Sequence, residues 1–296
     1  MKKLSIVILS YNTRELLRNC LKSIWKHKDE ADLEIIVSDN GSKDGSDEIV
    51  KEEFPEVILI ENKKNLGFAA GNNKAKDLVK GQYVLILNSD TEIRKSTLKE
   101  TIRYLDEHQA IGALTCKVVL PSGKLDADAR RSFPTPLVAF SHFSGMDRVF
   151  PNSKLFARYW YNYLPEDLTH DVDVVQGAFT LVRKKVIDEV GWYDESYFLD
   201  GEDIDLCWKI KKAGYKIVYY PKVSILHIKG ASKGKKHSFG KVTKQERVKF
   251  INAGVDSMEI FYKKRLWDKY PLAINLGVIL SIRTLKSLRY IKALLS

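Results

Sequence analysis

The sequence contains few cysteines, only Cys20, Cys116 and Cys207 among 296 residues. They are odd in number, far apart and surrounded by apolar neighbours, so the chain has no CxxC pair and no disulfide framework. A zinc ribbon and a small disulfide-stapled fold are therefore excluded. We expect three reduced, buried thiols, as in a cytoplasmic protein.

Long apolar runs are also missing. The longest, residues 271–282, has 12 residues, whereas a membrane-spanning helix needs roughly 20. Two lysines and then five apolar residues, Leu4 and residues 6–9, precede Tyr11 and Asn12, and this pattern predicts a first strand rather than a signal peptide. The sequence therefore leaves contact with a membrane surface open and excludes a spanning helix.

Two glycine-rich nucleotide motifs are absent. The sequence has no GxxxxGK[ST] phosphate loop and no GxGxxG after its first apolar run, so the P-loop and dinucleotide-binding classes are excluded. If a nucleoside diphosphate binds, a metal ion rather than a glycine cradle must hold its phosphates.

Acidic residues are scarce near the C-terminus. Residues 229–296 carry 16 Lys or Arg against 4 Asp or Glu, a net charge of +12, whereas residues 1–228 carry 33 against 34. On a helix from Leu285 onward, apolar and basic side chains occupy different faces: Leu285, Leu288, Ile291, Leu294 and Leu295 against Lys286, Arg289 and Lys292. This pattern favours a helix lying in a membrane interface. Alternatively, the apolar face packs on the rest of the chain or on a second subunit, which leaves a homodimer open.

Apolar runs alternate with helical periodicity over the first 115 residues. We expect strands at 4–9, 33–37, 57–60 and 83–87. We expect helices at 14–27, from after Ser46 to about Glu53, at 68–79, and from a Ser96 cap to about Glu107. Hydrophobic residues make up 44% of the chain, enough for one large core. This order predicts an α/β fold with a mostly parallel sheet and helices on both faces.

The alternation stops after Pro121. Residues 133–163 hold nine of the 31 aromatic residues and predict a loop-rich insert that could cover a cleft. The alternation returns with residues 172–182, a short helix from Lys184, a helix at about 203–213, and strands near 215–220 and 223–228. We therefore expect one catalytic domain over 1–228, with halves 1–115 and 116–228, followed by a basic tail over 229–296.

Four polar clusters follow predicted strands, at residues 10–12, 39–42, 88–90 and 201–205. Ligands of such sheets bind beyond the carboxyl ends of the strands, so we expect the four clusters to line one crevice. Carboxylates there can accept hydrogen bonds from a base or ribose, or bind a hard cation. Asp and Asn are also common turn formers and helix caps, which is the alternative for each cluster alone.

Six short motifs occur in an order that resembles one known family. They are Ser10-Tyr11-Asn12, Asp39 to Ser46, Asn65 to Asn73, Asn88-Ser89-Asp90-Thr91, Gln176-Gly177-Ala178 and Gly201 to Cys207. Together they are similar to the family 2 glycosyltransferases of the GT-A fold, and most similar to the bacterial rhamnosyltransferase-like branch, over residues 4 to about 228. The resemblance implies an inverting hexosyltransferase of cell-wall or polysaccharide biosynthesis.

The resemblance assigns the donor site. Asp39 matches the aspartate that binds a pyrimidine base, which implies a UDP- or dTDP-sugar donor, and its alternative role is to cap a turn. Tyr11 and Asn12 match positions that line the nucleotide pocket, although Tyr11 could equally be a packing residue.

The resemblance also implies a metal site. Asn88, Ser89 and Asp90 match the metal-binding motif with Asn in its first place, which leaves Asp90 as the one anion there. His227 matches a histidine that joins this site. The cofactor implied is a divalent cation, Mg²⁺ or Mn²⁺, and the alternative for His227 is a residue that merely ends a strand.

On the acceptor side, the resemblance makes Asp203 the general base and Glu202 an acceptor-orienting residue. Gln176 and Gly177 match the acceptor wall, and Trp192 could stack on a sugar. The alternative for the carboxylates is that they charge the first turn of a helix, which its dipole favours. The acceptor implied is a glycan or a polyprenyl-diphosphate-linked sugar, with the enzyme peripheral on the inner face of the cell membrane.

Two other functions fit the sequence less well. A nucleic-acid-binding protein would explain the basic tail, but the carboxylate clusters would repel phosphate, and we expect no nucleic-acid partner. A sugar nucleotidyltransferase usually has a glycine-rich loop after its first strand, whereas this chain has Ser10-Tyr11-Asn12 there. Rhamnose is the sugar that we expect first.

Overall fold

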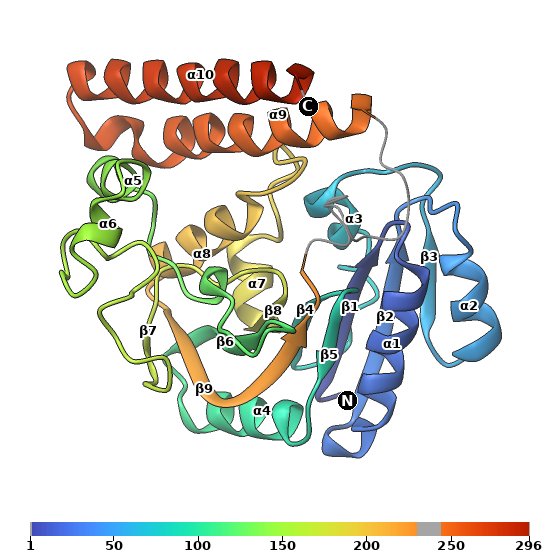
Figure 1. The fold of residues 1–296 in the computed structure, drawn as a ribbon. Coiled ribbons are helices and arrows are strands. Elements are labelled where there is room, and N and C mark those ends of the chain that lie inside the picture. The colour runs from blue at the N-terminus through green and yellow to red at the C-terminus, as the bar shows by residue number, and fades with distance from the viewer. Residues whose placement is uncertain (1, 230–243, 296) are drawn as a thin grey trace.

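The computed structural model describes residues 2–229 and 244–295, which form helices around one nine-stranded sheet (Figure 1). The strands are β1 (Leu4–Ser10), β2 (Leu33–Asp39), β3 (Ile58–Glu61), β4 (Tyr83–Asn88), β5 (Thr91–Ile93), β6 (Ile111–Val119), β7 (His170–Asp171), β8 (Phe179–Arg183) and β9 (Lys216–His227). The helices are α1 (Arg14–Trp25), α2 (Ser46–Glu53), α3 (Phe68–Asn73), α4 (Thr97–Glu107), α5 (Pro136–Phe143), α6 (Met146–Val149), α7 (Lys184–Val190), α8 (Glu202–Lys212), α9 (Lys244–Phe261) and α10 (Leu272–Leu295). Short turns of other helix types are η1 (Lys28–Glu30), η2 (Ala127–Ala129), η3 (Tyr262–Leu266) and η4 (Trp267–Lys269).

The N-terminal half of the sheet is parallel. β1 pairs with β2 and β4, and β2 with β3, all in parallel. Because helices cover both faces of such a sheet, its central strands are continuous apolar runs with almost every side chain buried. The carboxyl ends of β1, β2 and β4 consequently meet at one edge of the sheet, where three of the polar clusters lie.

The rest of the sheet is mixed. In the order β3-β2-β1-β4-β8-β6-β9-β5, β8 is antiparallel to both β4 and β6, and β5 is antiparallel to β9. The predicted strands 215–220 and 223–228 are one strand, β9, with a shift in its register against β6 between Cys116 and Lys117. Pro221 lies in this irregularity, where its missing N–H costs no ladder hydrogen bond.

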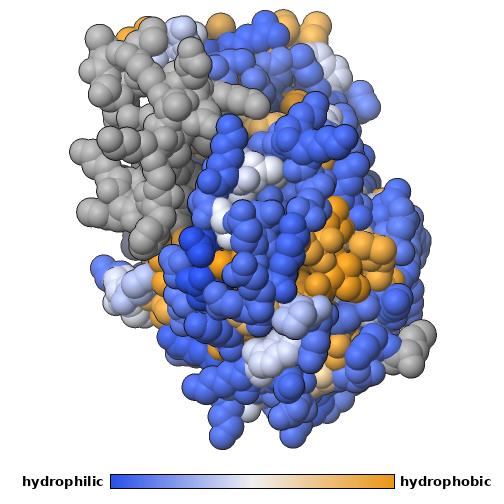
Figure 2. Space-filling model, turned by 90° about the vertical axis from the view of Figure 1, so that its right-hand side faces the viewer, coloured by the Kyte–Doolittle hydropathy of each residue, from blue (hydrophilic) through white to orange (hydrophobic). Residues whose placement is uncertain are grey.

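Figure 2 shows the side that lies to the right in Figure 1, where β3 is the edge strand. Hydrophilic side chains cover most of this side, with one large hydrophobic area to the right of centre and smaller ones elsewhere. β3 has only four residues, and its side chains Ile58, Leu59 and Ile60 are half-buried. A short edge strand limits pairing with other chains.

Helix α4 begins where the sequence indicated, but a different residue caps it. Ser96 makes no side-chain capping bond. Instead the Glu30 carboxylate accepts hydrogen bonds from the backbone N–H groups of Ser96, Leu98 and Lys99, at 2.5, 3.1 and 3.3 Å. A carboxylate at this end also complements the helix dipole, so a residue 66 positions away replaces the expected local cap.

The three cysteines are free and buried, as predicted. Burial raises the pKa of the Cys20 and Cys207 thiols to about 12. These thiols are therefore protonated and unreactive at neutral pH.

Helices α9 and α10 form a hairpin that packs on the rest of the molecule (Figure 1). A second apolar cluster joins the hairpin to the sheet domain: Tyr197, Phe261, Tyr262, Leu266 and Ile279, with Phe133, Ile204 and Trp208 against it. Arg265 also binds the fully buried Asp205 carboxylate through two nitrogens, at 2.7 and 3.1 Å. Residues 230–243 and 296 of the predicted basic tail lie outside the described residues. Within the ranges 2–229 and 244–295, no helix is long and apolar enough to cross a bilayer.

Candidate active site

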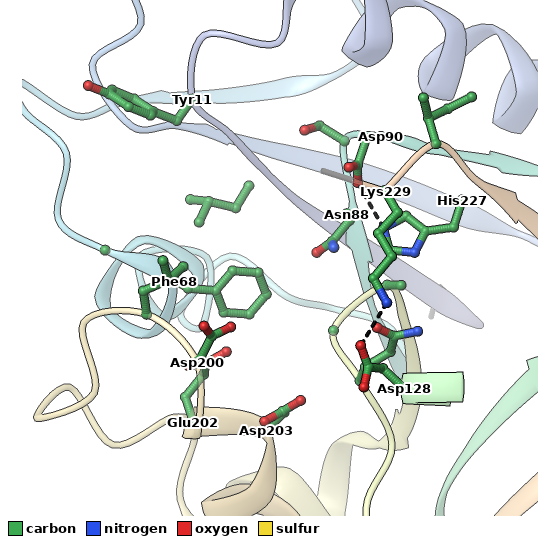
Figure 3. Close-up of a pocket in the computed structure, with 18 of the residues that line it drawn as sticks. Tyr11, Phe68, Asn88, Asp90, Asp128, Asp200, Glu202, Asp203, His227 and Lys229 are labelled. Carbon is green, nitrogen blue, oxygen red and sulfur yellow. Dashed lines mark hydrogen bonds and ion pairs between the residues drawn. The ribbon is translucent and has the colours of Figure 1, made fainter. Parts of the chain in front are cut away.

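A cavity of about 610 Å³ lies at the carboxyl ends of β1 and β4 (Figure 3). Nine of the residues singled out in the sequence line it: Tyr11, Asn88, Ser89, Asp90, Gln176, Gly177, Glu202, Asp203 and His227. The cluster at 39–42 contributes Asn40. All four polar clusters therefore meet at one cavity.

Asp39 and Asn12 do not line this cavity, and their side chains hold the loops beside it. The Asp39 carboxylate accepts hydrogen bonds from the backbone N–H of Gly41 at 3.0 Å and from the N–H and hydroxyl of Ser42 at 2.8 and 2.6 Å. The Asn12 side-chain oxygen accepts a hydrogen bond from the Lys43 N–H at 2.8 Å. The turn-forming alternative for Asp39 is thus present in the structure, and its role toward a pyrimidine base stays a prediction.

Asn40 and Gly67 shape the wall that carries Phe68. The Asn40 amide donates to the Asn65 side chain at 3.0 Å and to the Gly67 carbonyl at 3.1 Å. Gly67 has φ +86°, and a Cβ there would lie 2.4 Å from the Phe198 carbonyl oxygen. Only glycine allows this close approach, so the 65–68 segment and the 198–203 loop form adjoining walls of the cavity.

Asp90 and His227 meet because β5 and β9 pair antiparallel, with Thr91 opposite His227. His227 Nε2 lies 3.3 Å from Asp90 Oδ1, and His227 Nδ1 donates to Asp126 Oδ2 at 2.9 Å. Burial lowers the pKa of the imidazolium, but hydrogen bonds to Asp126 and Asp90 outweigh burial and raise the pKa to about 9. His227 is therefore held between two carboxylates, with Nε2 directed at Asp90.

The Asp90 and His227 pair fits a divalent cation that binds together with substrate. Asp90 Oδ1 is buried and lies 3.3 Å from His227 Nε2. The other nitrogen of this histidine is oriented by a carboxylate, which is the arrangement found around metal-bound histidines. Among the described residues there is no cluster of three or more His, Cys, Asp or Glu side chains that could hold a metal. The remaining ligands must then be phosphate oxygens and water, which hard cations accept.

Sequence reasoning missed several cavity residues, among them Asp128, Arg131 and Lys229. Lys229 Nζ binds Asp126 at 2.5 Å and Asp128 at 2.7 Å, which places one ammonium group beside the His227 pair (Figure 3). Burial alone would raise the pKa of Asp126, but hydrogen bonds from His227 and Lys229 hold it well below its usual range. The sequence pattern that could have indicated Asp128 and Arg131 is the charged run that follows β6, Asp126-Ala127-Asp128-Ala129-Arg130-Arg131.

Arg131 forms an ion pair with Asp203, and both side chains are only 12% exposed. Burial lowers the pKa of the Arg131 guanidinium, but the Asp203 charge outweighs burial and holds the pKa well above its usual range. The second Asp203 oxygen accepts the Ile204 N–H at 2.8 Å. The pair therefore fixes the orientation of the Asp203 carboxylate at the cavity wall. Figure 3 shows Asp203 and Glu202 across the cavity from Asp90 and His227.

Gln176 and Gly177 lie on the wall between these groups. The Gln176 amide donates to Asp126 Oδ2 at 3.1 Å and so supports the carboxylate that orients His227. A Cβ on Gly177 would lie 2.6 Å from the edge of the Phe68 ring, so glycine lets this ring reach the cavity.

Trp192 is not at this cavity. Its side chain is 9% exposed, belongs to the main apolar core, and donates from Nε1 to Asp188 at 3.3 Å. It borders a separate depression together with Lys209 and Arg265. The structure therefore does not bring Trp192 to the predicted acceptor site, because its ring is used for packing.

Comparisons with known proteins agree with this geometry. The model of the family described as "Glycosyl transferase family 2" matches residues 5–191. The N-acetylglucosaminyl-diphospho-decaprenol L-rhamnosyltransferase of Mycobacterium tuberculosis is 26% identical over 243 residues, which cover 78% of each chain. The low-salt glycan biosynthesis hexosyltransferase Agl10 of Haloferax volcanii is 22% identical over 76% of this chain and 66% of its own.

Solved structures share the fold. The mannosyltransferase PcManGT from Pyrobaculum calidifontis, in complex with GDP-Man and Mn²⁺, has a TM-score of 0.58 at 18% identity, over 88% of this chain and 64% of its own. S. aureus TarS 1-349 in complex with UDP-GlcNAc has a TM-score of 0.55 at 19% identity, over 86% of this chain and 66% of its own. At these identities the likeness shows the predicted GT-A architecture and nothing about the substrate.

Proposed function

This chain belongs to the glycosyl transferase family 2, and we propose that it moves a sugar from a pyrimidine nucleoside diphosphate to a lipid-linked or cell-surface glycan acceptor, with inversion at the anomeric carbon. One observation carries the proposal: Glu202 and Asp203 face the Asp90 and His227 pair across a single cavity (Figure 3). A base and a site for the leaving diphosphate are both needed for this reaction, and they must lie on opposite sides of the sugar.

Asp203 is the proposed general base. Its carboxylate takes the proton of the acceptor hydroxyl while that oxygen forms a bond to the anomeric carbon, and the bond to the diphosphate oxygen breaks with its electron pair leaving on the diphosphate. Base catalysis of this kind contributes about 10² to 10⁴ in rate. Arg131 supports it, since the ion pair holds the Asp203 carboxylate in one orientation at the cavity wall.

Asp90 and His227 are the proposed ligands of a divalent cation, Mg²⁺ or Mn²⁺. Such an ion would neutralise the charge that develops on the leaving diphosphate. Asp126 and Gln176 orient His227, and Lys229 lies close enough to add a positive charge to the same region. These contacts support a diphosphate-binding role for this side of the cavity.

The donor and acceptor are proposed from similarity. The Mycobacterium tuberculosis relative is named for rhamnose transfer to a decaprenol-linked N-acetylglucosamine diphosphate, which supports dTDP-rhamnose as the first donor and a polyprenyl-diphosphate sugar as the first acceptor to examine. Tyr11, Asn12, Asn88, Ser89 and Asp39 are the proposed donor-side residues, and Glu202, Gln176 and Gly177 the acceptor-side residues. A lipid-linked acceptor would place the enzyme at the surface of the cell membrane.

Replacing the base tests the mechanism. Purified Asp203→Asn protein should bind nucleotide as the wild type does but lose roughly 10² to 10⁴ in the rate of transfer to a polyprenyl-diphosphate N-acetylglucosamine acceptor. Asp188→Asn, which removes a carboxylate outside the cavity, is the matched control and should keep full activity. Full activity of Asp203→Asn would refute the assigned base.

A further inference from the structure

Exposed apolar side chains are concentrated in two segments that are distant in sequence. Thirteen of the fifteen large hydrophobic side chains that are exposed among the described residues come from 137–155 and 272–291: Leu137, Phe140, Phe143, Val149, Phe150 and Leu155, and Leu272, Ile274, Leu276, Leu280, Leu288, Tyr290 and Ile291. The first segment covers α5, α6 and the loop after them, and the second is α10. Single exposed apolar residues are ordinary, but grouped ones mark an interaction surface.

Helix α10 presents one apolar stripe outward. Leu272, Leu276 and Leu280 follow each other at intervals of four residues and are 63%, 57% and 68% exposed. Ile279 and Ile282 are buried, and Ile279 packs in the apolar cluster that joins the hairpin to the sheet domain. Residues four apart lie on the same face of a helix, so the three leucines share one outward face. The buried face of α10 packs on α9, whereas the outward leucines have no packing partner within the described residues.

Helix α5 has the same organisation. Val138 and Ser141 are buried, whereas Phe140 and Phe143 are 62% and 54% exposed. Figure 1 shows α5 beside the end of the hairpin at which α10 begins. Phe133, just before α5, stacks on Phe261 at the end of α9, with ring centroids 6.3 Å apart, so α5 lies near the start of α10.

Charge decides between a lipid surface and a second copy of the chain as the partner. Helix α10 contains Arg283, Lys286, Arg289 and Lys292 and no acidic residue. Arg283 and Lys286 pair with Glu259 and Asp256 of α9, and residues 143–158 add three basic residues against one Asp. A symmetric dimer through these faces would bring like charges together, whereas an anionic lipid surface would attract them, and phenylalanine and leucine side chains enter the interface beside them.

We propose that α10 and the α5–α6 segment together form one docking surface for an anionic bilayer. This inference rests on the proposed function insofar as a membrane-held acceptor explains why such a surface is useful. The surface is tied to the cavity, because Ser257 on α9 donates to the Leu199 carbonyl at 3.0 Å in the loop that leads to Glu202 and Asp203. The membrane contact predicted for the tail thus includes a second element, the α5–α6 segment.

Vesicle flotation of the full chain tests this surface without requiring activity. Phosphatidylcholine vesicles with and without phosphatidylglycerol are the probes, and the wild type should float only with the anionic ones. The double variants Phe140→Ser/Phe143→Ser and Leu276→Gln/Leu280→Gln should each weaken this binding by at least roughly tenfold, since each removes two large apolar side chains from the interface. Leu168→Gln, which replaces an exposed leucine (44%) outside both segments, should bind like the wild type.

Three results would overturn the docking surface. They are no flotation of the wild type, full binding by the α5 variant, or a wild-type dimer in light scattering that the α10 variant converts to a monomer. Circular dichroism melts show whether each variant is folded. Calorimetric titration with dTDP and Mn²⁺ tests the proposed function separately, so a protein that binds nucleotide but not vesicles contradicts only the docking surface, and the reverse contradicts only the transferase.

Discussion

At the scale of single residues, the side chains that line the cavity come from separate parts of the chain. Polar residues just beyond strands predicted Asn88, Asp90 and Asp203 correctly as cavity residues. Trp192 was expected there and is a core residue instead. The difference arises because the strand-end rule fixes where a backbone segment lies, whereas the direction of a side chain depends on neighbours from distant parts of the chain.

The charged groups around His227 also depend on residues that are distant in the sequence. His227 was found through its resemblance to a family position, but Asp126, which orients it at 2.9 Å, lies 101 positions away. Arg131, the partner of Asp203, lies 72 positions away. No local pattern marks such pairs, because they exist only after β6, β8 and β9 are assembled.

The raised pKa of His227 predicts a pH dependence of stability in metal-free protein. The folded pKa of about 9 lies above the unfolded value of 6.5, so the stabilising contribution is complete below pH 6.5 and is lost as the pH rises through 9. The loss should be on the order of 3 kcal/mol. Urea unfolding between pH 6 and pH 10 in the presence of a chelator measures it.

His227→Gln is the comparison for that series. Glutamine can still form hydrogen bonds with Asp126 but does not titrate, so its free energy of unfolding should change much less between pH 6.5 and 9. Parallel curves for the two proteins would mean that His227 is not held as a cation between Asp90 and Asp126.

At the scale of secondary-structure elements, the sequence predicted the parallel half of the sheet but not its mixed half. Buried parallel strands such as β1 and β4 are uninterrupted apolar runs, which few other structures produce. Strand β6 (Ile111–Val119) was not predicted, since Gly112, Thr115 and Cys116 interrupt its apolar pattern. The antiparallel direction of β8 depends on long-range pairing with β4 and β6, which no local sequence signal specifies.

The contact between α8 and the hairpin gives a prediction at this scale. Arg265→Met would leave the fully buried Asp205 carboxylate without its two-nitrogen partner, and we expect a loss of about 3–5 kcal/mol in the free energy of unfolding. Lys263→Met is the matched control, because Lys263 pairs with Glu259 at the surface and is 50% exposed, and it should cost less than about 1 kcal/mol. Denaturant titration measures both.

Equal stability of the two variants would contradict this picture. It would mean that the α9–α10 hairpin is attached to the sheet domain by its apolar cluster alone, with Asp205 reaching another partner or water when Arg265 is removed.

At the scale of the whole molecule, the basic tail was expected either to contact a membrane or to pack on protein, and these two roles are not exclusive. Helix α9 and the turn after it pack on the sheet domain through Phe261, Tyr262 and Leu266. Helix α10 still exposes leucines on its outer face. Composition predicted a basic amphipathic segment, but only the three-dimensional arrangement separates the face that packs on protein from the face that remains exposed.

The family and its architecture were predictable from six short motifs in order, and both are shown by the family match over residues 5–191 and by the solved structures of the same fold. The donor sugar was not predictable in this way. Its specificity depends on a few contacts inside the cavity, and the relatives and fold neighbours differ in the sugars and nucleotides for which they are named.

Calorimetric titration of the purified chain with UDP, dTDP and GDP, each with and without Mn²⁺, tests the central claim most directly. We predict Mn²⁺-dependent binding of a pyrimidine nucleoside diphosphate that Asp90→Ala weakens by roughly tenfold or more and that Asp188→Ala, outside the cavity, leaves unchanged. Absence of binding for all three nucleotides under both conditions, or equal binding by Asp90→Ala, would contradict a metal-assisted donor site in this cavity.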